Sequence, residues 1–299
     1  MTTIDHAVDF TVGRAAIGGA LGAFCDRYLR DIEPRVADAI RYSLTGEGKR
    51  MRGILFLSTF EAAGGHGDAG SLAAAIEVVH AYSLVHDDLP CMDDDDVRRG
   101  RATVHRVYGV RVATAAGLAM VPLAAWAAAD AAQALGLGDV VVGDVVAELM
   151  RASGAGGMIG GQLLDLEGEG RPLALEDLER IHRAKTGALI TAAAVLGGRA
   201  AGAPAQRLVA LARFGEAIGL AFQIADDVLD VTATTDQLGK TAGRDLALRK
   251  STYPALLGVA GARARAAALV EEGTAALHAE GLHTPALARI ARFTVERTS

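Results

Sequence analysis

Apolar residues recur at every third or fourth position through most of the chain. Between residues 207 and 230 they include Leu208, Leu211, Phe214, Ile218, Phe222 and Leu229. This spacing matches the 3.6-residue turn of an α-helix, whereas a half-buried strand would alternate strictly between apolar and polar positions. The pattern predicts an all-α protein in which ten or more helices pack as a bundle.

Short segments rich in glycine and proline separate the predicted helices. None of them resembles an interdomain linker, so we expect a single domain over residues 1–299. Leu175 to Leu178 is typical of a helix start, because Glu176 and Asp177 would lie in the first turn, where the helix dipole favours acids. The predicted breaks are 64–70, 136–138, 153–157, 168–172, 197–204, 232–239 and 281–285.

Composition and charge narrow the possible functions. Half of the chain (51%) is hydrophobic but only 4% is aromatic, which favours closely packed helices over sheets. The net charge of −6 offers no general attraction for nucleic acid. If the substrates are polyanions, local basic groups or bound cations must attract them.

The sequence also bears on the cellular compartment. The N-terminal residues lack the basic and apolar regions of a signal peptide, and Cys25 and Cys91 lack the spacing of a zinc site. The uncharged run from Val112 to Ala129 approaches the length of a membrane span, but it is rich in small residues and contains Pro122. We interpret this run as a buried, kinked helix and expect a cytoplasmic protein without a membrane span.

The segment after His80 joins an apolar helix to a concentration of acids. Asp87 and Asp88 follow the apolar stretch, and Pro90 should end or bend the helix there. His80 precedes Asp87 by two turns, so both should share a face. Four consecutive acids at 93–96 follow. So many neighbouring carboxylates repel one another, and a hard cation such as Mg²⁺ would offset that repulsion. The alternative is a solvated acidic loop.

A second acidic cluster interrupts another apolar helix. Asp226 and Asp230 are one turn apart on the same face, and Gln223 lies one turn before Asp226. Acids on so apolar a helix must be buried beside a partner, exposed in a cleft or bound to a cation. Mg²⁺ takes only one or two carboxylates per ion and completes its shell with water and substrate phosphate. Two such clusters facing across a cavity would form a clamp for a diphosphate.

Basic residues near the two clusters are weak signals individually. Lys49 and Arg52 can share a helix face and hold a phosphate, although most such groups are solvated surface. Arg98 and Arg99 could simply pair with the acids that precede them. Other basic residues close to the acidic clusters are Lys185, Lys240 and Lys250.

Together, these motifs resemble those of the trans-type polyprenyl diphosphate synthases, most of all the bacterial farnesyl diphosphate synthases. The resemblance runs from about Arg41 to Leu257, and the motifs follow the family's order, which is far more specific than one aspartate motif. They are Gly-Lys-Arg-Met-Arg at 48–52, His-Asp-Asp-Leu-Pro-Cys-Met-Asp-Asp-Asp-Asp-Val-Arg-Arg-Gly at 86–100, Gly-Gly-Gln-Leu-Leu-Asp-Leu at 160–166, His-Arg-Ala-Lys-Thr-Gly-Ala-Leu-Ile at 182–190, Phe-Gln-Ile-Ala-Asp-Asp-Val-Leu-Asp at 222–230 and Lys-Ser-Thr-Tyr-Pro at 250–254.

The resemblance implies a fold of the isoprenoid synthase type, a helical bundle around a central apolar pocket, usually in a homodimer. It also implies three Mg²⁺ ions. Asp87 and Asp93 would hold ions on one side of an allylic diphosphate, with Asp88 in support. Asp226 would hold the third ion from the opposite side, with Asp227 and Asp230 nearby.

The same resemblance assigns the basic residues to two diphosphates. Arg98, Lys185 and Lys240 would contact the allylic diphosphate, and Lys250 joins the substrate-binding residues through its motif. The residues implied to bind isopentenyl diphosphate are Lys49, Arg52, His80 and Arg99.

The implied reaction condenses isopentenyl diphosphate with dimethylallyl or geranyl diphosphate to give farnesyl diphosphate. Metal ions and cations stabilise the departing diphosphate, so the allylic C–O bond ionises. Lys185, Thr186 and Gln223 form the implied catalytic set, with Thr186 and Gln223 stabilising the carbocation. No protein nucleophile is needed, in agreement with the lack of a Ser/Cys–His signature.

Chain length should depend on the residues before Asp87. The resemblance implies that Tyr82, five residues before this aspartate, limits the product to about fifteen carbons, with Ser83 beside it. The alternative is that Tyr82 is an ordinary core aromatic.

Three positions depart from the family pattern. Leu118 stands where the family usually has an aspartate, which we interpret as a partner near the site, so the change could lower activity. Gly53 replaces a usual proline, and Thr298 and Ser299 replace basic C-terminal residues. Alternatives to a farnesyl diphosphate synthase are a longer-chain (geranylgeranyl) synthase, a non-catalytic partner subunit and a terpene cyclase.

Overall fold

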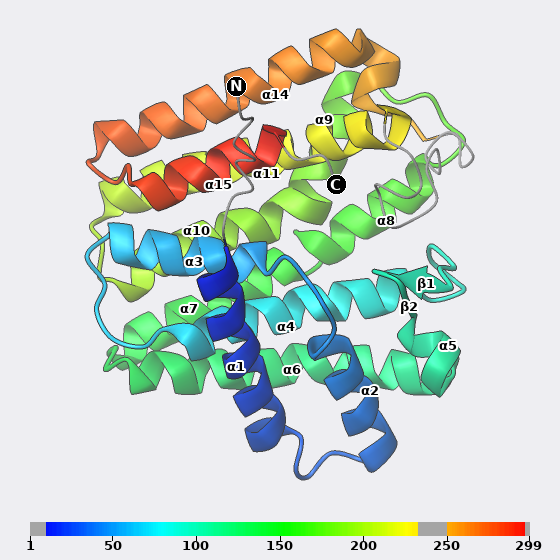
Figure 1. Ribbon diagram of the computed structural model, residues 1–299, viewed down its shortest axis with the longest axis vertical. Coiled ribbons are helices and arrows are strands. Elements are labelled where there is room, and N and C mark those ends of the chain that lie inside the picture. The colour runs from blue at the N-terminus through cyan, green and yellow to red at the C-terminus, as the bar shows by residue number, and fades with distance from the viewer. Residues whose placement is uncertain (1–9, 233–249, 297–299) are drawn as a thin grey trace, which may run out of the picture.

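The protein is almost entirely helical, as shown by a computed structural model that describes residues 10–232 and 250–296. Most helices lie side by side, with α14 at one end of the stack and α6 at the other, while α1 and α2 cross them (Figure 1). The all-α prediction is therefore confirmed. The helices are α1 Thr11–Tyr28, α2 Pro34–Leu44, α3 Met51–Ala62, α4 Gly70–Asp87, α5 Val104–Tyr108, α6 Val110–Ala134, α7 Asp139–Ser153, α8 Met158–Gly168, α9 Leu175–His182, η1 Arg183–Gly187, α10 Ala188–Ala200, α11 Ala205–Thr232, α14 Tyr253–Ala279 and α15 Pro285–Glu296.

Helix α4 lies in the middle of the bundle and contacts α1, α3 and α6. It is buried along most of its length because its sequence is apolar on nearly every side, from Leu72 to Val85. A helix that is hydrophobic all round must lie inside a protein. Because α4 ends at Asp87, this core helix delivers the first acidic cluster to a fixed place, and the helix end before Pro90 agrees with the sequence.

One predicted break is wrong in its position. The segment 197–204 was expected to be a loop, but α10 continues to Ala200. A Cβ atom on Gly197 would lie 2.1 Å from Thr59 Oγ1 and 2.5 Å from the Phe56 carbonyl oxygen. This glycine therefore allows α10 to approach α3 closely and does not end the helix.

A small hairpin was also absent from the sequence prediction. Strands β1 (Val97–Arg98) and β2 (Arg101–Ala102) pair antiparallel between α4 and α5. They are too short to show alternation, and a turn through Arg99 and Gly100, both at positive φ, joins them. The hairpin matters because it folds Arg98 back towards the acidic cluster.

Helix α6 differs from the expected buried helix. Helices α6 and α11 are both long and apolar enough to cross a membrane by length and composition, and 44% and 61% of their apolar windows are buried. Helix α6 contains Pro122 and leaves Leu118 64% and Trp126 58% exposed. It packs on α4 and also on α2, α5 and α7, but part of its surface stays exposed, so we correct the prediction to a half-buried surface helix.

Candidate active site

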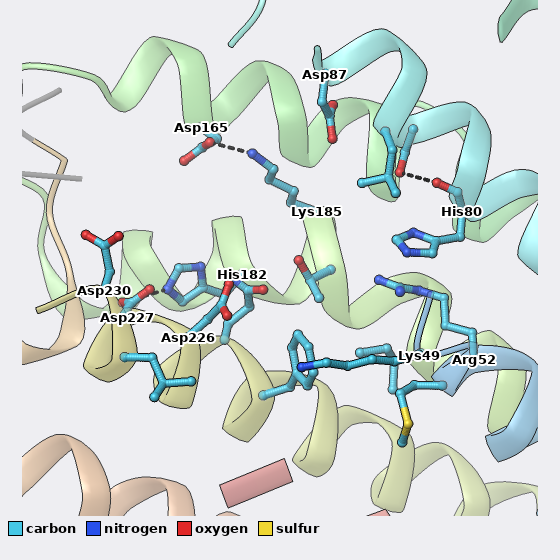
Figure 2. Close-up of a pocket in the computed structure, with 18 of the residues that line it drawn as sticks. Lys49, Arg52, His80, Asp87, Asp165, His182, Lys185, Asp226, Asp227 and Asp230 are labelled. Atoms are coloured by element: carbon cyan, nitrogen blue, oxygen red, sulfur yellow. Dashed lines mark hydrogen bonds and ion pairs between the residues drawn. The ribbon is translucent and has the colours of Figure 1, made fainter. Parts of the chain in front are cut away.

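One cavity of about 490 Å³ collects most of the predicted site residues. They come from α3, α4, η1 and α11 and from the segments before α3, after α4 and before α14. Figure 2 shows the aspartates of α4 and α11 on opposite sides of this space, with basic side chains between and beside them. Predicted residues that line the cavity are Lys49, Arg52, His80, Ser83, Asp87, Asp93, Arg98, Arg99, Lys185, Thr186, Gln223, Asp226, Asp230 and Lys250.

The first acidic cluster splits into two roles. Asp87 and Asp93 line the cavity, and the Asp93 backbone N–H donates to the Asp87 carbonyl oxygen at 2.8 Å, which folds the loop back over the helix end. Asp88 is buried instead and accepts a hydrogen bond from Arg98 Nε at 2.6 Å. Asp88 thus orients Arg98 and is not part of the cavity lining, whereas Asp95, which was not predicted, is.

Burial has the largest effect on the pKa of Asp87. It raises the pKa of this carboxyl to about 6; Lys185 opposes the shift and Asp93 adds to it. A carboxylate that is this costly to ionise in a pocket is a good place for a cation. The pKa of Asp88 is also raised by burial, against the stabilising hydrogen bond from Arg98.

All three acids of the second cluster on α11 line the cavity, unlike those of the first cluster. Asp226 and Asp230 line the cavity from one face, as their spacing predicts. Asp227 is buried, accepts a hydrogen bond from the Tyr253 backbone N–H at 2.9 Å and lies 3.3 Å from His182 Nε2. Asp227 therefore fastens α11 to α9 and to the start of α14.

Asp165 on α8 is a site residue to which we assigned no role from the sequence. Its Oδ2 atom lies 2.7 Å from Lys185 Nζ and 2.8 Å from Lys250 Nζ (Figure 2 shows the Lys185 contact). Burial alone would raise the pKa of Asp165, but the two lysines outweigh it and lower the pKa to about 2. An acid in the apolar run Leu-Leu-Asp-Leu was a visible signal, of the same kind that identified Asp226.

A π-helical turn presents Lys185 and Thr186 to the cavity. Residues Arg183–Gly187 form this turn between α9 and α10. π-Turns inside helices occur frequently at functional sites because they redirect side chains. A Cβ atom on Gly161 would lie 2.1 Å from the Lys185 backbone nitrogen, so this glycine lets α8 touch the turn.

The predicted basic group forms the other end of the cavity. Figure 2 shows Arg52 beneath the ring of His80, with Lys49 on the neighbouring wall. Arg52 Nε and His80 Nδ1 are buried and have no hydrogen-bond partner within residues 10–232 and 250–296. Burial lowers the pKa of His80 far below its usual value, and Arg52 and Arg99 add to this shift. Unsatisfied donors at a cationic cavity wall favour an anionic ligand.

Tyr82 and Ser83 are consecutive residues on α4, but their side chains have different surroundings. Ser83 lines the cavity and donates to the His80 carbonyl oxygen at 2.9 Å. Tyr82 is buried behind this wall and packs edge-on against His86, with ring centroids 5.0 Å apart. Its role in chain length stays a prediction.

Two other predicted positions are Leu118 and Lys240. The side chain of Leu118 is exposed on α6 and does not line the cavity. The interpretation that this position lies beside the site is therefore wrong within a single chain. Lys240 lies outside the described residues.

The donor set fits Mg²⁺. Within the residues that the structure describes, no three His, Cys, Asp or Glu side chains form a complete metal site. Mg²⁺ does not need one, because water and substrate phosphate complete its octahedron. Asp87, Asp93, Asp226 and Asp230 supply only hard carboxylate oxygens from two sides of the cavity.

Comparisons with known proteins agree with this geometry. The chain is 45% identical over 270 residues to farnesyl diphosphate synthase of Escherichia coli, covering 88% of this chain and 89% of that protein. It is 44% identical over 264 residues to geranylgeranyl pyrophosphate synthase 9 of Arabidopsis thaliana, covering 87% and 73%.

Among solved structures, an FPP/GFPP synthase from Zymomonas mobilis matches with a TM-score of 0.84 and 32% identity over 95% of this chain and 98% of that one. A geranyltransferase from Helicobacter pylori, complexed with magnesium and isoprenyl diphosphate, matches with a TM-score of 0.77 and 30% identity over 97% and 98%. The polyprenyl synthetase family model matches residues 33–279. The chain therefore belongs to the polyprenyl synthetase family, and it is a prenyltransferase with the all-α fold of the isoprenyl synthases.

Proposed function

We propose that this protein is a Mg²⁺-dependent farnesyl diphosphate synthase that joins isopentenyl diphosphate to dimethylallyl or geranyl diphosphate. The observation that carries the proposal is one cavity with two opposed carboxylate pairs at one end and a separate basic group at the other. This arrangement offers distinct places for two diphosphates, one held through metal ions and one held by side chains directly.

The allylic diphosphate occupies the carboxylate end. Asp87 and Asp93 on one side and Asp226 and Asp230 on the other would hold three Mg²⁺ ions, which would supply positive charge for the departing diphosphate. Arg98 and Lys185 add hydrogen bonds to it. Lys240 and Lys250 complete the set of cations assigned to the substrates.

The carbocation is stabilised by groups on the cavity wall. Thr186 and Gln223 both line the cavity and present oxygen atoms that attract positive charge. Apolar wall residues such as Leu84, Ile190 and Ile218 exclude the water that would quench the cation.

Isopentenyl diphosphate occupies the basic end, where its double bond can attack the carbocation. Lys49, Arg52 and Arg99 bind its diphosphate. His80 binds as a neutral donor, because its pKa is lowered by burial and by the surrounding arginines. The attack leaves a positive charge on the substituted alkene carbon of the isopentenyl unit. The departing diphosphate then accepts a proton from the neighbouring carbon, and the electrons of that C–H bond form the new double bond.

Product length is the finer part of the proposal. Relatives named farnesyl and geranylgeranyl synthases are almost equally similar to this chain. Tyr82 supports the shorter product, because a buried aromatic behind Ser83 narrows the path along α4. A geranylgeranyl diphosphate synthase is the second candidate.

One assay tests the proposal. The protein is incubated with Mg²⁺, isopentenyl diphosphate and either dimethylallyl or geranyl diphosphate, and the products are sized by chromatography, with EDTA as control. A fifteen-carbon linear product that EDTA abolishes is expected. A twenty-carbon product would identify a longer-chain synthase, the absence of elongation a partner subunit, and a cyclic hydrocarbon a cyclase.

We further propose a single-domain, cytoplasmic protein that acts as a homodimer. The exposed face of α6 supports the dimer, because Leu118 and Trp126 lie two turns apart and both are more than half exposed. Covering such apolar side chains against a second copy is favourable.

A further inference from the structure

A buried acid lies behind the basic end of the cavity and has no part in the proposed chemistry. Glu77 is in the middle of α4, one turn before His80, and is 2% exposed. It does not line the cavity. Burying a carboxylate costs several kcal/mol unless partners offset it, so the contacts of Glu77 indicate why it is there.

The first contact is with the start of α3. Glu77 Oε1 accepts a hydrogen bond from the Gly53 backbone N–H at 2.9 Å. The N-cap residue of α3, Arg50, has φ of 51° and makes no side-chain capping bond. Glu77 therefore caps α3 from another helix. This bond needs glycine or another residue with an N–H, and a proline at position 53 could not make it.

The second contact is with the arginines around the cavity. Glu77 Oε2 lies 4.0 Å from Arg50 Nη1, whose guanidinium is also held by two backbone carbonyls. The negative charge of Glu77 opposes the effects of burial and of Arg99 that lower the pKa of Arg52 to about 10. It also opposes the lowering of the pKa of Arg99. One acid thus acts on three crowded guanidiniums.

We propose that Glu77 is an internal counter-charge for the basic subsite, holding the arginines together while the subsite is empty and weakening its affinity for diphosphate. The inference rests on the proposed function, because it takes Arg52 and Arg99 as ligands of the second diphosphate. An empty group of buried arginines repels itself, and a ligand diphosphate relieves that repulsion. Since Glu77 already relieves part of this repulsion, the binding of diphosphate releases less free energy.

The test uses inorganic pyrophosphate in the presence of EDTA, so that binding through metal ions does not contribute. Glu77→Gln keeps the size and an oxygen that accepts from Gly53, but removes the charge. We expect its melting temperature without ligand to fall, while its Kd for pyrophosphate falls roughly tenfold, the size of one unit-charge interaction across a protein interior. Thermal shift and titration calorimetry measure the two effects.

Two controls separate charge from packing. Glu77→Asp keeps the charge and shortens the reach to Gly53, so it should lower the melting temperature without tightening pyrophosphate binding. Asp130→Asn removes an acid that binds Arg27 and Tyr28 between α1 and α6, away from the cavity. It should destabilise the protein and leave the Kd unchanged.

The outcomes separate the inference from the function. If Glu77→Gln binds pyrophosphate as weakly as the wild type or more weakly, the counter-charge role is wrong even when the wild type makes prenyl products. If the wild type does not bind pyrophosphate in EDTA, the basic subsite itself is wrong, and this inference fails with it. Should Glu77→Gln be unfolded alone, recovery of the fold by pyrophosphate supports the inference and no recovery refutes it.

Discussion

At the residue scale, the ionic groups in the cavity are held by partners on other helices. Asp165 on α8 binds Lys185 in the π-turn and Lys250 before α14, so one carboxylate joins three segments. Asp88, at the end of α4, likewise holds Arg98 of the hairpin. These contacts place the cations before any substrate arrives, which reduces the cost of ordering them during catalysis.

Asp165→Asn should lower the free energy of unfolding by about 2 kcal/mol at pH 7. The pKa of Asp165 is lowered from 3.8 to about 2, and each pKa unit corresponds to about 1.4 kcal/mol. A lowered pKa stabilises the fold above the unfolded-state value and loses that contribution as pH falls through the folded-state value. Denaturant unfolding should therefore show the difference from wild type at pH 7 and its disappearance between about pH 4 and pH 2.

Asp144→Asn provides the control for this experiment. Asp144 binds Arg199 at 2.7 Å, but its side chain is 52% exposed, and exposed pairs contribute less than about 1 kcal/mol. If both variants lost the same free energy of unfolding, the burial of Asp165 and its pairing with two lysines would add nothing to stability.

Tyr82→Ala should lengthen the product beyond fifteen carbons. Removing the buried ring opens space behind Ser83 along the path that a growing chain would take. Chromatography of the dephosphorylated products gives the length, and Tyr82→Phe, which keeps the ring, should leave it unchanged. An unaltered product from Tyr82→Ala would mean that this tyrosine is only a core aromatic.

At the element scale, the approach of α8 to the π-turn decides where Lys185 and Thr186 lie. The absence of a side chain at Gly161 allows this approach, because a Cβ atom would overlap the backbone of the turn. The glycines at 197 and 198 act similarly for α10, the first against α3 and the second against the side chain of Leu211. Small residues thus fix the distances between helices in this bundle.

Gly161→Ala should reduce kcat by roughly tenfold to a hundredfold, because moving the turn by even a fraction of an ångström displaces the catalytic groups. Overpacking of this kind also costs about 1–3 kcal/mol of stability. Gly143→Ala is the matched control, since a Cβ atom there meets nothing within 4 Å on α7. It should be neutral or stabilise the protein slightly. Steady-state rates and thermal unfolding of both variants decide the matter.

At the scale of the whole molecule, two helices bring their carboxylates to opposite sides of one cavity. Helix α4 runs through the middle of the bundle and α11 packs against α10 and α14 (Figure 1). The exposed apolar side chains of Leu118 and Trp126 on α6 would be covered by a second copy in the proposed homodimer.

Leu118→Arg should convert that dimer to a monomer, because a charge buried between two copies lacks a partner. Light scattering after size-exclusion chromatography measures the mass. Val12→Arg serves as control: Val12 is 82% exposed on α1, so its replacement should leave the mass unchanged. A wild-type protein that is already monomeric would remove the dimer proposal.

Much of the site was predictable from the sequence because its chemistry depends on local spacing. Asp87 at the end of α4, and Asp226 and Asp230 one turn apart on α11, lie where their spacing places them. The partners of buried charges were not predictable, since Asp88 with Arg98 and Asp227 with Tyr253 depend on contacts between segments that are separate in sequence.

The sequence by itself determined the helical class, the family and most of the charged residues assigned to the substrates and metal ions, because periodicity and ordered motifs are properties of consecutive positions. Only the tertiary structure decided which acids face the cavity and which brace its walls. It also turned Leu118 outwards, united Asp165 with two lysines and placed Glu77 behind the arginines. The reason is physical: the ionisation and pairing of a buried group depend on what surrounds it in space, and distant segments supply those neighbours.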